Sequence, residues 1–167
     1  MTEDQFWTII DAATDDDFQA TLDRLAAGLA RLSDRDLLEF IDVFRAIHRR
    51  AYAWDLWAAG YLIEGGMGDD SFDYFRNWVI AQGRAAFDRA LADPDSLADL
   101  AWDEEAMDSA ESYAYVALDE MDRRGLTEPA PGSTPEPERE PAGEPFPEED
   151  DEWFARRFPR ISARIDG

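Results

Sequence analysis

The sequence contains no cysteine and no lysine, and His48 is its only histidine. The absence of cysteine excludes disulfides, thiolate metal sites and a cysteine nucleophile. A single histidine also excludes a histidine-rich metal site, and we expect His48 to lie on a helix surface or at the edge of the core rather than to act as a catalyst. All 16 basic residues are arginines, a pattern typical of a high-GC bacterial genome.

Long uncharged runs are also missing. The longest, residues 56–63, has eight residues, whereas a membrane-spanning helix needs ~20 apolar residues and a signal peptide needs a clear apolar region. The first ten residues contain no basic side chain that would open a signal peptide. We therefore predict a cytoplasmic protein without a membrane partner.

The acidic side chains dominate the charge balance. The 167 residues include 39 acidic and 16 basic side chains, which gives a formal net charge of −23. Binding to nucleic acid phosphates needs a basic stripe, but the arginine pairs at 49–50, 123–124 and 156–157 are each diluted by nearby acids. The charge therefore argues against direct binding of nucleic acid or anionic membranes. It leaves open a basic protein partner, a cation, or solubility alone.

The apolar residues of 1–126 recur at helical spacing, and strand-like alternation is absent. The composition, 45% apolar and 13% aromatic, is too rich in apolar residues for a disordered chain. The fold class is therefore predicted to be all-α, a compact multi-helix bundle. Capping patterns at Thr2 with Gln5 and at Ser33 with Asp36 mark two helix starts. The predicted helices span residues 2–13, 15–32, 33–47, 51–63, 69–93 and 104–124.

Proline divides the chain into three predicted parts. Only Pro94 precedes residue 127, and the other eight prolines follow it. We expect 1–126 to form a helical domain, 127–149 a flexible Pro/Glu-rich loop or linker, and 150–167 a short amphipathic C-terminal segment. The residues of this last segment expected to dock on a helical surface are Trp153, Phe154, Phe158 and Ile161.

The densest group of reactive and aromatic side chains surrounds the glycine turn at 65–68. The predicted binding residues are Trp54, Asp55, Trp57, Glu64, Asp69, Asp70, Tyr74 and Arg76. Their carboxylates could bind a cation through oxygens, or form an acid–base pair among the aromatic rings. We favour a structural interpretation. In it, one of Asp69 and Asp70 caps the next helix, the other pairs with Arg76, and the aromatics belong to the core.

Residues 51–91, AYAWDLWAAGYLIEGGMGDDSFDYFRNWVIAQGRAAFDRAL, together with FW near the start and DPDSLA, resemble the bacterial family of domain of unknown function 4240. The GEPF and FPRI segments also look like the end of that family, which would make the proline-rich stretch an internal loop. The resemblance implies an uncharacterised, mostly helical protein and supplies no activity. The family often has GGCSDD where this chain has GGMGDD at 65–70, so a thiol or hydroxyl mechanism at that turn is not expected.

Two classes of function follow from these observations. The first is a non-enzymatic interaction protein that engages a protein partner, in particular a basic one, through its acidic and aromatic surface. The alternative is a carboxylate-dependent, metal-assisted hydrolase centred on Asp69, Asp70 and Glu64, with Asp69 and Asp70 as the candidate metal ligands. The lack of cysteine, of a second histidine and of a recognised catalytic motif favours the first class, and no cofactor is predicted.

Overall fold

The computed structural model describes residues 1–127 and 140–167, and all the regular structure in those ranges is helical. The predicted all-α fold is therefore confirmed. The elements in chain order are α1 (Glu3–Ala13), α2 (Phe18–Leu29), α3 (Asp34–Arg50), α4 (Trp54–Glu64), α5 (Asp69–Ala81), α6 (Arg84–Ala92), the 3-10 helix η1 (Pro94–Asp99), α7 (Glu104–Asp108), α8 (Glu111–Arg123), α9 (Asp151–Arg157) and α10 (Pro159–Asp166).

Local capping residues set the starts of α1 and α3. The Thr2 side chain accepts a hydrogen bond from the backbone N–H of Gln5, and the Gln5 side chain accepts one from the Thr2 N–H. The Ser33 hydroxyl accepts from the Asp36 N–H at the start of α3. Each bond pairs an amide that the helix itself leaves free. These two predicted starts are confirmed.

Two of the predicted helices are interrupted. Residues 69–93 form α5 and α6, because Gly83 between them has φ +87°, and a Cβ there would lie 2.8 Å from the Asp11 Oδ1. The same Asp11 oxygen accepts a hydrogen bond from the Arg84 N–H at 2.8 Å, so a side chain of α1 pairs the first amide of α6. Residues 104–124 are likewise broken between Asp108 and Glu111 into α7 and α8.

One aromatic cluster of the core, called the aromatic core below, lies between α4 and α5. The Trp57 ring stacks on Trp54 at 5.1 Å and on Phe72 at 4.6 Å, and its Nε1 donates a hydrogen bond to the Met67 carbonyl at 3.0 Å. Gly60 of α4 leaves room for Met67 of the turn and Phe75 of α5, since a Cβ there would lie 2.8 Å from the Met67 Cε and 3.0 Å from the Phe75 Cδ1. The prediction that α4 is buried on most sides is confirmed, with Trp57 only 8% exposed.

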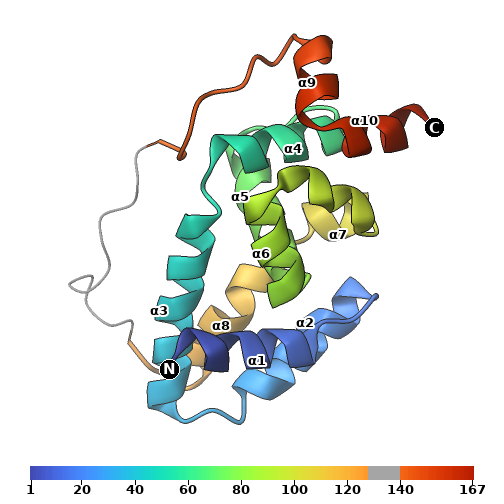
Figure 1. Cartoon of the computed structure of the whole chain (residues 1–167). Helices are drawn as coiled ribbons and strands as arrows, with labels where there is room; N and C mark the ends of the chain where they lie inside the picture. The colour runs from blue at the N-terminus through green and yellow to red at the C-terminus, as the bar shows by residue number, and fades with distance from the viewer. Residues whose placement is uncertain (128–139) are drawn as a thin grey trace.

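The C-terminal helices pack against the rest of the chain. Figure 1 shows α9 and α10 at the end of the molecule opposite α1 and α2, where α10 contacts α4 and η1. Phe158 and Ile161 are completely buried. The buried Asp95 carboxylate of η1 accepts hydrogen bonds from the N–H groups of Arg160 and Ile161 at 3.0–3.1 Å. This carboxylate therefore pairs the amides at the start of α10.

Part of the predicted linker also contacts the helices. Ala142 exchanges backbone hydrogen bonds with Tyr52 and Trp54, each at 2.9 Å, and the Phe146 ring packs edge-on against Trp54 and Tyr61. Residues 128–139 of the predicted flexible loop, 127–149, lie outside the described residues. The boundaries of the three predicted parts stay a prediction.

In the two described ranges, no helix is both long enough and apolar enough to cross a membrane.

Candidate functional site

The glycine turn joins the end of α4 to the start of α5. Gly68 is the N-cap residue of α5 and makes no side-chain capping bond, while Asp69 and Asp70 occupy the first two helical positions and are exposed. The prediction that one of these aspartates caps α5 is wrong, because the N-cap lies one residue earlier, at a glycine with no side chain. Both carboxylates act on α5 through its dipole instead.

Arg76 pairs with a different carboxylate from those predicted. Its Nη2 donates to the Asp73 Oδ1 at 2.6 Å and its Nη1 to the His48 carbonyl at 3.1 Å. The expected pairing with Asp69 or Asp70 is wrong, because these lie about two helical turns before Arg76, whereas Asp73 lies one turn away on the same face. The buried guanidinium also lies over the Tyr52 ring at 4.9 Å. Arg76 is thus a buried structural residue.

His48 lies beside this ion pair, at the edge of the core. Its ring stacks on Phe44, and its Nε2 is 3.3 Å from the Asp73 carbonyl oxygen. Burial and the positive charge of Arg76 lower the pKa of His48 to about 4, against the opposing effect of Asp73. The imidazole is therefore neutral at physiological pH, as a core-edge histidine rather than a charged ligand.

The other predicted binding residues lie in different surroundings. Trp54 and Trp57 stack on each other in the aromatic core. Asp55 is exposed and forms an ion pair with Arg157 of α9 at 2.5 Å. Tyr74 is half-buried on α5. Of the eight predicted side chains, the structure therefore brings the two tryptophans into contact, while Asp55 faces the C-terminal helices and Arg76 faces the interior.

Glu64 is a predicted site residue with a strongly raised pKa. Burial at the end of α4, together with the nearby carboxylates of Asp108 and Glu104 on α7, raises its pKa to about 7. The neutral form is favoured because each negative neighbour opposes ionisation. Among residues 1–127 and 140–167, no group of three or more histidine, aspartate or glutamate side chains is arranged to hold a metal ion.

We expect Glu64→Gln to stabilise the protein at pH 8 and to have no effect at pH 4. With a pKa raised from 4.5 to about 7, the folded state holds this proton more tightly than the unfolded state, so stability is lost as the pH rises from 4.5 to 7. Each pKa unit corresponds to about 1.4 kcal/mol. Because Glu64 is only half-buried, solvent screening reduces the gain to about 1–2 kcal/mol. Urea denaturation at both pH values measures this change in the free energy of unfolding.

The exposed Glu148→Gln variant is the control for this comparison. It should leave the free energy of unfolding unchanged, within about 0.5 kcal/mol, at both pH values. An equal effect of Glu64→Gln at pH 4 and pH 8 would contradict the raised pKa.

An acidic groove that the sequence did not predict lies between α2 and α7. It consists of two adjoining cavities of about 820 and 630 Å³, both lined by Asp16, Phe18, Asp103 and Glu105. Among the described residues, no arginine lines either cavity. The carboxylates that line the groove are Asp15, Asp16, Asp17, Asp99, Asp103, Glu104 and Glu105.

Four of these seven carboxylates already have partners. Asp17 accepts from the Ala20 N–H at the start of α2, and Asp103 accepts from the Ala106 N–H at the start of α7. Asp15 pairs with Arg24 at 2.6 Å, and Asp99 pairs with Arg160. Within the described chain, the remaining three form no ion pair with an arginine. They are Asp16, Glu104 and Glu105.

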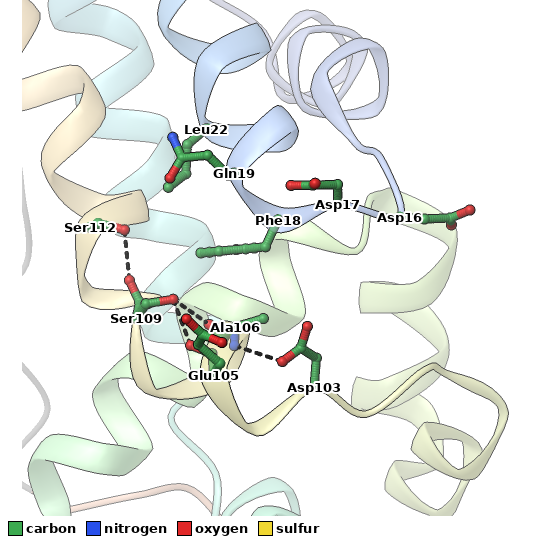
Figure 2. Close-up of a pocket in the computed structure, with 10 residues that line it drawn as sticks. All are labelled: Asp16, Asp17, Phe18, Gln19, Leu22, Asp103, Glu105, Ala106, Ser109 and Ser112. Atoms are coloured by element: carbon green, nitrogen blue, oxygen red, sulfur yellow. Dashed lines mark hydrogen bonds between the residues drawn. The ribbon is translucent and has the colours of Figure 1, made fainter.

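Aromatic rings lie between the carboxylates. Figure 2 shows Phe18 projecting from the start of α2 into the space above α7, with Asp103 and Glu105 below it. Trp102 lines the larger cavity, and its Nε1 donates to the Leu97 carbonyl at 2.9 Å. The guanidinium of Arg164 lies 3.9 Å from the Trp102 ring centroid. The groove therefore combines negative charge with rings suited to cation–π contact.

The groove left a signal in the sequence. Residues 15–18 read DDDF and residues 102–105 read WDEE, so each side contributes acids next to an aromatic residue. From the sequence alone, residues 15–18 are predicted only to begin a helix, and no local pattern joins them to residues 102–105.

The chain matches the family described as "Protein of unknown function (DUF4240)" over residues 1–123. Both sides of the groove lie in this match, whereas α9 and α10, with the GEPF and FPRI segments, lie beyond it. The comparisons with curated proteins and with solved structures give no match. With most of its length covered by the family, including every helix from α1 to α8, the chain belongs to the DUF4240 family.

Proposed function

We propose that the protein is a non-enzymatic interaction protein of the cytoplasm, and that it binds a basic segment of another protein in the groove between α2 and α7. The observation that carries this proposal is the lining of the groove. Seven carboxylates border the two cavities, and no arginine of the described chain lies among the lining residues. The net charge of −23 adds a long-range attraction for a basic partner.

The unpaired acids give the groove its preference for cations. Asp16, Glu104 and Glu105 make no ion pair in the described residues, so a partner's arginine or lysine gains a contact without breaking an existing one. Their effect is electrostatic and falls with salt, because the Debye length is ~8 Å at physiological ionic strength. The contact of Arg164 with Trp102 at 3.9 Å shows that this ring accepts a guanidinium.

The size of the groove suits side chains of a peptide. Ligand pockets usually enclose roughly 300–1,000 Å³, and the two cavities measure about 820 and 630 Å³. A single metal ion needs its oxygen ligands gathered within ~2.6 Å of it, and the described residues include no such group. The dimensions therefore favour an extended basic segment over a bound ion.

We expect the Asp16→Asn/Glu104→Gln/Glu105→Gln variant to bind an arginine-rich peptide about tenfold more weakly than the unaltered protein. Each exposed ion pair contributes ~0.5 kcal/mol, and three of them add up to about the 1.4 kcal/mol of a tenfold change. Fluorescence anisotropy of a labelled nona-arginine peptide measures the dissociation constants.

The matched control removes three exposed carboxylates away from the groove, in the variant Asp122→Asn/Glu148→Gln/Asp166→Asn. It changes the net charge by the same amount but leaves the groove intact, so it should weaken peptide binding by less than threefold. Equal losses in the two variants would show that the peptide responds only to the net charge, and the proposed groove would be wrong.

A carboxylate-dependent hydrolase centred on Glu64, Asp69 and Asp70 is the second candidate. The observation in its favour is the pKa of Glu64, which burial raises to about 7, a value suited to general acid–base catalysis. A screen with ester, phosphoester and peptide substrates, with and without Mg²⁺, tests it. Turnover that disappears in Glu64→Gln and is unchanged in Glu148→Gln would support the hydrolase over the interaction protein.

A further inference from the structure

A separate cavity of about 150 Å³ lies between α3, α5 and α8. Its inner part is apolar, since the lining residues Phe40, Ile41 and Ala117 are all buried. Two other lining residues, Ala114 and Leu118 of α8, are partly exposed. The cavity therefore reaches from the core towards solvent along α8, and it shares no lining residue with the acidic groove.

Two polar side chains that line this cavity have no hydrogen-bond partner for their amide or hydroxyl atoms in the part of the chain that the structure describes. Asn77 of α5 and Tyr113 of α8 are each 1% exposed. The Asn77 Nδ2 and Oδ1 and the Tyr113 hydroxyl make no hydrogen bond with any described residue. Most buried polar groups in folded proteins are paired, and an unpaired one is costly. The Asn77 amide thus carries an unpaired donor and an unpaired acceptor beside an apolar space. Neither atom is accessible in this structure, so the side chain must rotate toward the cavity to bind a ligand there.

The charged groups around the cavity are already engaged. The Asp73 carboxylate is held by Arg76 at 2.6 Å. His48 is neutral near physiological pH, because burial lowers its pKa to about 4. Arg45 also lines the cavity and has an interaction of its own. An uncompensated ligand charge would lose its hydration at the apolar walls, so a neutral ligand is favoured.

We propose that this cavity binds a small neutral carboxamide with an aromatic or compact apolar body. The carboxamide would accept a hydrogen bond from the Asn77 Nδ2 and donate one to the Asn77 Oδ1, and the apolar body would lie against Phe40 and Ile41. A cavity of ~150 Å³ with apolar walls is large enough for one benzene-sized ring. This ligand site is independent of the basic partner proposed for the groove.

Benzamide, benzoate and benzene are the probes for the test. Isothermal titration of the full chain measures the affinity for each probe, and the melting temperature measures the stabilisation that each one gives. We expect saturable binding of benzamide and a rise in melting temperature. Benzoate, which has nearly the same shape but a negative charge, should bind at least tenfold more weakly. The Asn77→Leu variant should lose at least tenfold in benzamide affinity and keep its affinity for benzene, because only the hydrogen-bonding groups are removed.

Two variants of α8 complete the test. Ala114→Leu adds volume at the cavity and should weaken the binding of benzamide and of benzene alike. Tyr115→Leu lies on the exposed side of the same helix and should bind both probes with the affinity of the unaltered protein. If Asn77→Leu does not fold, the ratio of benzamide to benzoate affinity and the Ala114→Leu result decide the question. A cavity filled only by water would give no saturable benzamide binding, and this result would overturn the proposal. Equal affinity for benzamide and benzoate would overturn it too.

Discussion

Trp57→Ala is expected to lower the free energy of unfolding by about 3–5 kcal/mol, the usual cost of removing a large buried aromatic side chain. The indole lies between the rings of Trp54 and Phe72, and its Nε1 pairs the Met67 carbonyl at 3.0 Å. Its removal opens a cavity between α4 and α5 and leaves that buried carbonyl without its donor. Urea denaturation followed by circular dichroism measures the loss.

Tyr115→Ala is the control for this substitution, because Tyr115 is 48% exposed. It should change the free energy of unfolding by no more than about 0.5 kcal/mol. A Trp57→Ala protein as stable as the Tyr115→Ala protein would show that Trp57 is not a core residue.

Removing residues 150–167 should be at least as damaging, with a loss of about 4.5–9 kcal/mol. The truncation takes away three buried apolar side chains, Phe154, Phe158 and Ile161, each worth ~1.5–3 kcal/mol when fully buried. It also exposes the surface of α4 and η1 that α10 covers. The melting temperature of the truncated chain, compared with that of the full chain, measures the effect.

Two point substitutions separate packing from chain length. Phe158→Ala removes a completely buried ring and should cost about 3–5 kcal/mol, whereas Ile165→Ala in α10 changes a side chain that is 46% exposed and should be nearly neutral. A truncated chain that melts like the full chain would contradict the packing of α9 and α10 on the helical body.

The parts of the fold that were predictable depend on neighbouring residues in the sequence. Thr2 with Gln5 and Ser33 with Asp36 form caps within one helical turn, so the sequence alone locates them. The break at Gly83 depends on Asp11, more than 70 residues away, whose oxygen pairs the first amide of α6. No local pattern shows such a contact, and the sequence therefore predicts one continuous helix over 69–93.

The candidate site was harder to predict than the fold for the same physical reason. Residues 15–18 and 102–105 come together around the two cavities only in the folded protein. The predicted ion pair of Arg76 with Asp69 or Asp70 was wrong for a different reason. Three carboxylates, Asp69, Asp70 and Asp73, lie upstream of Arg76 on one helix, and only helical geometry selects the one at i−3.

The signals of the indole N–H groups in a ¹⁵N-labelled sample, recorded with and without nona-arginine, test the proposed basic-partner groove most directly. The chain has six tryptophans; Trp102 lines the groove, whereas Trp54 and Trp57 stack in the aromatic core beside the glycine turn. Binding in the groove predicts a saturable shift of the Trp102 signal, with the Trp54 and Trp57 signals unchanged. A shift of Trp54 and Trp57 without one at Trp102 would contradict the groove and place binding at the glycine turn.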